Sequence, residues 1–173
     1  MSDRKQALIA AAFDTIATKG FEGLRLRDVA TRAGIDHSTL HHHFATKQAL
    51  IADVVLWATS QFWPTMPPDG PARQRLRTHL DALAEMIQQR PELFVVLDEF
   101  DTRARRDPDV QAVVTRLEAG WRRALGQLFT DGGHDDPQTA TELVIATVKG
   151  VRLAPQHAGA VLGQLATLIW TQR

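Results

Sequence analysis

The chain has 173 residues, of which 44% are apolar and 23% are charged, and its formal net charge at pH 7 is zero. These values are typical of an ordinary globular protein with one generous domain or two small ones. The absence of cysteine excludes disulfides, Cys-based zinc sites and thiol nucleophiles, and it fits a cytoplasmic protein. No apolar run approaches about 18 residues, and the N-terminal segment lacks a signal-peptide cleavage site, so we expect neither a membrane span nor a leader.

The charges are unevenly distributed along this neutral chain. Residues 1–50 contain seven Lys and Arg against five Asp and Glu, whereas residues 51–173 contain thirteen against fifteen. Overall neutrality argues against a nucleic-acid partner, but the small positive excess in the first fifty residues permits a DNA-facing N-terminal part.

Apolar residues recur at helical spacing along nearly the whole chain. The first segment shows this at Leu8, Ile9, Ala12, Phe13, Ile16 and Ala17, and Gly20 ends it. Proline follows a capping position at Gly70, Asp107 and Asp136, and less ideally at Arg90. Two apolar segments, 93–97 and 142–148, resemble strands, but helix formers flank both of them and no hairpin turn adjoins either. The sequence therefore predicts an all-α protein of about nine helices, over residues 3–19, 27–33, 38–44, 47–62, 71–89, 92–105, 108–129, 137–153 and 158–171.

Two of the short predicted helices lie on either side of a turn centred on Gly34. From the first helix Val29, Ala30 and Ala33 face inward, Ile35 fills the turn, and Leu40 and Phe44 face inward from the second. Glycine supplies the positive φ that such a short turn usually needs. This is a helix-turn-helix pattern, in which the second helix lies in the major groove of DNA.

Residues 7–50 resemble the DNA-binding domain of the tetracycline-repressor (TetR) family of transcriptional regulators. The resemblance rests on the Gly20-Phe21 pair, the DVA…AG helix, STL at the start of the third helix, and Phe44 followed by Lys47 and Leu50. It implies a helix-turn-helix DNA-binding domain over residues 1–46, followed by a helical effector-binding and dimerisation domain over residues 47–173.

The resemblance gives the histidine-rich segment 36–44 a role, because the third helix of such a fold recognises DNA. It implies that His37, Ser38 and His41 meet base edges. It also implies phosphate contacts from Thr39, His43 and Lys47, and a base or phosphate contact from Arg27. Imidazole and hydroxyl groups suit this task, since both donate and accept hydrogen bonds at short reach.

The segment departs from the family pattern at two positions. His41 stands where the family commonly has tyrosine, and Arg25 stands where Ser or Thr usually caps the second helix. Loss of that cap costs about 1 kcal/mol, unless Arg25 contacts a phosphate instead. These departures affect which operator sequence we expect the protein to bind, and they leave the expectation of DNA binding unchanged.

Metal binding and catalysis are the alternatives for the histidines. His37 and His41 have the i, i+4 spacing that zinc enzymes use, but no Glu stands at HExxH spacing, and a metal would occupy the surface needed for DNA. No nucleophile motif, P-loop or carboxylate pair stands nearby. We therefore expect no enzyme activity, no cofactor and no metal.

Two apolar stripes near the C-terminus predict a dimer interface. The first comprises Ala140, Leu143, Val144, Thr147, Gly150 and Val151, and the second comprises Ala158, Val161, Leu162, Leu165, Leu168 and Ile169. Glycines 150, 159 and 163 would allow close helix approach. The family resemblance implies that two such helices from each subunit form a four-helix interface. The alternative is a stripe buried within one chain.

In TetR-like proteins the middle helices enclose a pocket for a small, mostly apolar effector. Candidate lining residues here are Trp57, Met86, Phe94, Leu97, Trp121 and Leu125, and ordinary core packing is the alternative for each. We expect a homodimeric repressor that binds a palindromic operator and is released by its effector. The alternatives are an activator or effector-independent DNA binder of the same fold, or a histidine-cluster metal-binding protein.

Overall fold

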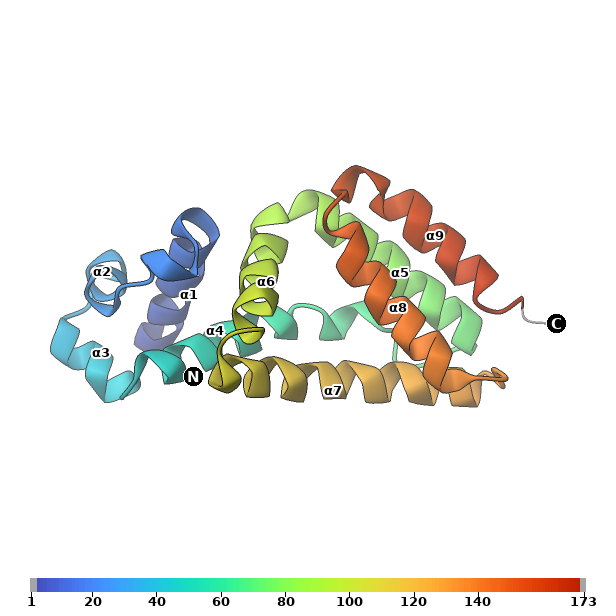
Figure 1. Ribbon diagram of the computed structural model, residues 1–173, viewed down its shortest axis with the longest axis horizontal. Coiled ribbons are helices and arrows are strands. Elements are labelled where there is room, and N and C mark those ends of the chain that lie inside the picture. Colours follow the sequence, from blue (N-terminus) through green and yellow to red (C-terminus); the bar gives the residue numbers. More distant parts are fainter. Residues whose placement is uncertain (1–2, 172–173) are drawn as a thin grey trace. The chain divides into compact units, whose positions relative to one another are not determined.

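The computed structural model describes residues 3–171, which fold entirely into helices and connecting turns (Figure 1). The α-helices of this range are α1 (Asp3–Lys19), α2 (Leu26–Arg32), α3 (His37–His43), α4 (Lys47–Ser60), α5 (Ala72–Gln89), α6 (Pro91–Ala104), α7 (Pro108–Asp131), α8 (Pro137–Val151) and α9 (Ala158–Leu168). Three 3₁₀ turns accompany them: η1 (Phe21–Gly23), η2 (Trp63–Thr65) and η3 (Pro155–His157). The prediction of an all-α fold with nine helices is confirmed, and the strand-like segments 93–97 and 142–148 lie inside α6 and α8. No helix within residues 3–171 combines the length and apolarity needed to cross a bilayer.

The helix ends either match the predicted ends or differ from them by up to three residues. The largest differences are at the C-terminal ends of α4, α7, α8 and α9, which lie at Ser60, Asp131, Val151 and Leu168. Beyond α4, Pro64 has no N–H to donate and disfavours helical backbone in the residue before it, so the chain continues as the 3₁₀ turn η2.

Aspartate and proline define the start of α8 as expected. The Asp136 carboxylate accepts the N–H of Thr139 at 3.0 Å, and Pro137 occupies the first turn. That hydrogen bond lowers the pKa of Asp136. At α5 the expectation was wrong in detail, because Pro71 itself is the capping residue and Gly70 precedes it with a φ of 110°.

The described chain forms two compact units. The first takes the chain up to Ser60 together with Glu92–Leu117, and the second takes Gln61–Pro91 together with the chain from Glu118 onward. Helix α4 belongs to the first unit, where it packs against α1. The boundary predicted between residues 46 and 47 separates two functions, DNA binding and effector binding with dimerisation, and not two compact units. It stays a prediction.

The core of the first unit is built from the apolar faces of four N-terminal helices and of α6. Its fully buried side chains include Leu8, Ile16, Val29, Leu40, Leu50, Val54 and Phe100. Phe13 and Trp57 meet edge to face at a centroid distance of 5.0 Å, which fixes α1 against α4. On the surface of the same pair, Lys5 Nζ lies 2.6 Å from the Asp53 carboxylate.

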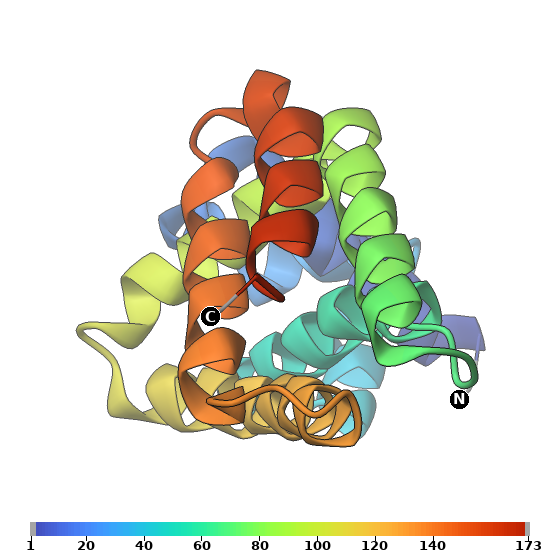
Figure 2. The same cartoon turned by 90° about the vertical axis from the view of Figure 1, so that its right-hand side faces the viewer.

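In the second unit α9 contacts both α5 and α8, and it lies between them in the view of Figure 2. The buried side chains here include Leu76, Leu80, Leu83, Val144, Leu162 and Phe129. Phe129, His134 and Trp170 form an aromatic cluster, and His134 Nε2 donates to the carbonyl oxygen of Ile169 at 2.7 Å because its Nδ1 accepts the N–H of Asp136. The end of α7 is thereby fixed to the end of α9.

A buried hydrogen-bonded chain runs through the second unit at His79. The Trp121 Nε1–H donates to His79 Nε2 at 3.1 Å, so the neutral ring carries its proton on Nδ1. That Nδ1–H donates to Thr65 Oγ1 at 2.7 Å, and the Thr65 hydroxyl donates to the carbonyl of Phe62 at 2.5 Å. Both ring nitrogens therefore have partners, and burial lowers the pKa of His79 to about 4.

The low pKa of His79 makes stability depend on pH. Between the ordinary histidine value near 6.5 and about 4, the unfolded chain binds a proton that the folded chain does not. The free energy of unfolding should therefore fall as the pH drops through this window, by at most about 1.4 kcal/mol per pH unit.

Urea unfolding at pH 7.5, 6.5, 5.5 and 4.5 measures this dependence. His79→Gln should show a weaker dependence on pH than the wild type, whereas the exposed His157→Gln should match it. Equal pH dependence in wild type and His79→Gln would contradict the assignment.

Candidate nucleic-acid interface

The turn between α2 and α3 has the geometry that the sequence predicted around Gly34. Gly34 has a φ of 66°, in the left-handed region. Its N–H donates to the carbonyl of Thr31 at 3.1 Å, and the N–H of Ile35 donates to the carbonyl of Ala30 at 2.9 Å. This pair of bonds is the Schellman motif, which satisfies the last carbonyls of α2 and redirects the chain into α3.

Helix α3 buries one face and exposes the other. Leu40 and Phe44 are buried, as predicted, together with Val29 and Ala30 of α2. On the opposite face His37, Ser38 and His41 are all exposed. The rings of His37 and His41 meet edge to face at a centroid distance of 4.6 Å, so the two imidazoles are neighbours on one continuous surface.

The predicted phosphate-contacting residues differ in exposure. Arg27 is exposed, whereas Thr39, His43 and Lys47 are half-buried. The start of α2 is as expected: Arg25 occupies the capping position and makes no side-chain capping hydrogen bond.

A group of charged side chains surrounds the buried ring of Phe21 in η1. Lys47 Nζ lies 5.6 Å from the ring centroid, and the Arg103 guanidinium lies 5.2 Å from it. Burial lowers the pKa of the Lys47 ammonium; Glu22 opposes this effect, while Arg103 and Arg25 add to it. Lys47 thus lies under the electrostatic influence of two cations, Arg25 and Arg103, and of the carboxylate of Glu22, which pairs with Arg103. The sequence did not indicate that Arg103 belongs with these residues, because it lies more than fifty positions after Lys47 in the chain.

The residues predicted for a dimer interface fall into two groups. Leu143, Val161 and Leu168 are exposed to 46%, 39% and 55%, and Gly150 is also exposed. Thr147 and Leu165 are half-buried. In contrast, Val151, Leu162 and Ile169 are buried within the chain, so for these three the intramolecular alternative describes their packing.

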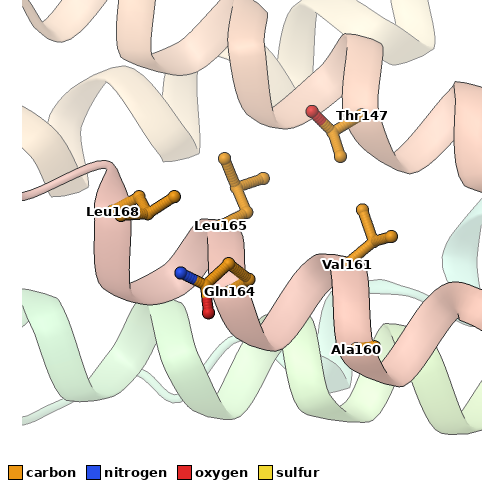
Figure 3. A pocket seen from close by; sticks show the side chains of 6 residues that line it. All are labelled: Thr147, Ala160, Val161, Gln164, Leu165 and Leu168. Carbon is orange, nitrogen blue, oxygen red and sulfur yellow. The ribbon is translucent and has the colours of Figure 1, made fainter.

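A shallow apolar depression of about 410 Å³ lies on the exposed edge of α8 and α9 (Figure 3). It is lined by Thr147 of α8 and by Ala160, Val161, Gln164, Leu165 and Leu168 of α9. In Figure 3 the side chains of Val161 and Leu165 project from α9 toward α8, which carries Thr147.

The candidate effector residues are divided between the two units. Trp57, Phe94 and Leu97 belong to the first unit, and Met86, Trp121 and Leu125 belong to the second. Phe94 and Leu125 are buried, while the other four are half-buried. Trp57 packs on Phe13, and Trp121 donates its hydrogen bond to His79.

Two family models match the chain. The model described as bacterial regulatory proteins, tetR family, matches residues 8–54, and the model described as BetI-type transcriptional repressor, C-terminal, matches residues 72–160. The HTH-type transcriptional regulator CymR of Pseudomonas putida is 30% identical over 160 residues, which cover 83% of this chain and 75% of CymR.

The chain belongs to the tetR family of bacterial regulatory proteins.

One further relative and one solved structure are similar to this chain. RutR of Escherichia coli strain K12 is 31% identical over 95 residues, which cover 51% of this TetR-family chain and 45% of RutR. A crystal structure of a TetR-family transcriptional regulator from Rhodococcus sp. superimposes with a TM-score of 0.85 at 23% identity, covering 99% of this chain and 100% of that one. The resemblance noted in residues 7–50 is confirmed, and the protein is a transcriptional regulator with a DNA-binding helix-turn-helix.

The histidines of this TetR-family protein do not form part of a larger cluster of ligating side chains. Across residues 3–171, no three or more His, Cys, Asp or Glu side chains come together in a way that could hold a metal ion. His37 and His41 contact each other, and their assignment to base edges stays a prediction.

Gly34 provides a test of the turn geometry. A Cβ at this position would meet nothing within 4 Å, so Gly34→Ala should cost only the backbone strain of a positive φ, about 1–2 kcal/mol of unfolding free energy. Asparagine tolerates this conformation better, so Gly34→Asn should cost less. Urea unfolding of the two variants measures both costs, and equal stability of Gly34→Ala and the wild type would contradict the assigned backbone.

Proposed function

We propose that this TetR-family protein is a homodimeric repressor that binds a palindromic operator and is released by a small, mostly apolar effector. The observation that supports DNA recognition best is the division of α3 into a buried and an exposed face. Leu40 and Phe44 anchor the helix, and His37, Ser38 and His41 remain exposed on its other side. Residues so placed can enter a major groove without disturbing the core.

The exposed face of α3 suits direct contact with base edges. Hydroxyl and neutral imidazole groups can each donate or accept a hydrogen bond, so they can pair with the donors and acceptors of the major groove. We assign Thr39, His43 and Lys47 to the flanking phosphates, and Arg27 to a neighbouring base or phosphate. The phosphate contacts fix the position of α3 without specifying sequence.

The exposed edge of α8 and α9 supports dimerisation. Leu143, Val161 and Leu168 present apolar surface there, next to the depression lined by Thr147 and Leu165. Gly150 and Gly163 have nothing within 4 Å of where a Cβ would be, so neither is needed for packing within the protomer. A second copy of the chain could use that space for close helix contact. The buried residues of the predicted interface would then pack beneath this edge within the protomer; they are Val151, Leu162 and Ile169.

A dimer would also recognise its operator more specifically than a monomer. One helix-turn-helix contacts a single half-site, whereas two held by a two-fold axis contact half-sites about 34–36 Å apart.

The repressor assignment draws on the match of residues 72–160 to a repressor C-terminal model. Effector release draws on the family resemblance, with Trp57, Met86, Phe94, Leu97, Trp121 and Leu125 as candidate lining residues. The protein would act in the cytoplasm, where the chromosome is.

Selection of bound sequences from random DNA tests the proposal. The wild type should enrich a palindrome whose half-sites are about one helical turn apart. His37→Ala and Ser38→Ala should each relax the preference at particular bases and cost about 1–3 kcal/mol. Lys47→Gln should weaken all sequences similarly and reduce the salt slope by about one, because it removes a phosphate contact. Failure of the wild type to enrich any sequence would overturn the proposal.

The oligomeric state tests the assigned interface. Val161→Glu and Leu168→Glu each place a charge on the apolar edge, so the double variant Val161→Glu/Leu168→Glu should sediment as a monomer at concentrations where the wild type is a dimer. Leu56→Glu is the matched control, because Leu56 is exposed to 53% but lies on α4. A double variant that remains dimeric would assign the interface to another surface.

A further inference from the structure

Helix α6 contacts the turn that precedes the helix-turn-helix, within the first unit. The Glu99 carboxylate accepts the N–H of Phe21 at 2.9 Å, across 78 positions of sequence. Gly20, just before Phe21, has a φ of 66°, and a Cβ there would be in ordinary van der Waals contact with Glu99 Oε2 at 3.4 Å. The backbone conformation of the turn, and not the space beside Glu99, is therefore what favours glycine.

Two further residues of α6 extend this contact. The ring of Phe100 meets the ring of Phe21 edge to face at 5.7 Å, and both rings are buried. One turn of helix after Glu99, Arg103 Nη1 lies 2.8 Å from the Glu22 carboxylate, and its guanidinium lies 5.2 Å from the Phe21 ring. Asp107 holds the same guanidinium at 3.2 Å from Nε. We call this set, Glu99, Phe100 and Arg103 against Phe21 and Glu22, the α6–η1 contact.

The parts of the α6–η1 contact differ in strength. The Glu22 side chain is 89% exposed, so its ion pair with Arg103 is screened by water and is weak alone. The hydrogen bond to Glu99 has a charged acceptor, and the contact between the rings is buried, so these two contribute more. The main-chain N–H of Phe21 is therefore the most informative atom to test.

The contact lies next to the residues assigned to DNA. Lys47, at the start of α4, places its ammonium 5.6 Å from the same Phe21 ring. Arg25, which begins α2, follows η1 after a single residue. A displacement of η1 would therefore move both the start of α2 and the surroundings of Lys47.

Helix α6 also carries two of the candidate effector residues, Phe94 and Leu97. Glu99, Phe100 and Arg103 follow them on the same fourteen-residue helix. A ligand that contacts Phe94 or Leu97 would thus act on a rigid element whose other end holds η1.

We propose that Glu99 and Arg103 are positioning residues for DNA binding. Through the α6–η1 contact they fix η1, and with it the orientation in which α2, α3 and Lys47 meet the operator. This inference rests on the proposed DNA-binding function and adds a specific route by which a change in α6 alters operator affinity. Neither residue contacts DNA in this scheme.

The first arm of the test uses the free protein. In Glu99→Ala the amide of Phe21 loses its acceptor, and its hydrogen exchange should accelerate by about tenfold or more, the value of a hydrogen bond to a charged acceptor. Glu99→Gln retains an acceptor oxygen and should exchange more slowly than Glu99→Ala. Circular dichroism melts confirm that each variant is folded, and Arg103→Met, a substitution at a half-exposed position, provides a second variant.

The second arm uses the operator obtained by selection, with the half-site spacing varied one base pair at a time. Glu99→Ala and Arg103→Met should bind the best operator about tenfold more weakly and tolerate a wider range of spacings, with the preferred half-site sequence unchanged. Arg105→Met removes the same charge from an exposed position just beyond α6 and should retain the wild-type spacing profile.

The outcomes separate this inference from the proposed function. If the wild type selects no DNA, the proposed function falls and the inference falls with it. If the wild type selects an operator but Glu99→Ala and Arg103→Met keep its affinity and spacing profile, only the inference is overturned. If Arg105→Met matches Arg103→Met, the effect is one of net charge, and the positioning role is also overturned.

Discussion

The burial of Leu40 and Phe44 is the constraint on which the DNA-binding surface depends. Helix α3 has only seven residues, far fewer than an isolated helix needs to be stable in water. Its conformation is therefore imposed by these two anchors and by the Schellman turn at Gly34, not by its own propensity. Because the anchors occupy one side of the helix, the exposed face at His37, Ser38 and His41 follows from the packing.

Sequence reasoning succeeded where local chemistry determines the structure. Gly34 and Gly20 marked turns because only glycine adopts a positive φ at low cost, and Asp136 with Pro137 marked the start of α8 because capping acts within three residues. It was weaker at the C-terminal ends of α4, α7, α8 and α9, which apolar spacing placed two or three residues from where they lie. In the C-terminal stripes, helical spacing identified apolar positions but not their neighbours. For that reason Leu162 and Leu168, on the same helix, differ completely in exposure.

The contacts that spacing could not show join residues far apart in the chain. Glu99 and Phe21 are separated by 78 positions, and His79 and Trp121 by 42. Each of these residues, taken alone in the sequence, is an ordinary exposed acid, a core aromatic or an isolated histidine. Only the packing of α6 beside η1, and of α7 beside α5, gives them partners. The assigned DNA contacts come from the family resemblance, and the structure supplies the scaffold that presents them.

The carboxylate of Glu22, which pairs with Arg103 and acts on Lys47, has a consequence for binding to non-specific DNA. A protein that is neutral overall, and that places an acid beside its cations, attracts the polyanion only weakly. Random duplex would then compete only weakly with the operator, and most of the residence time on the genome would come from matched base pairs.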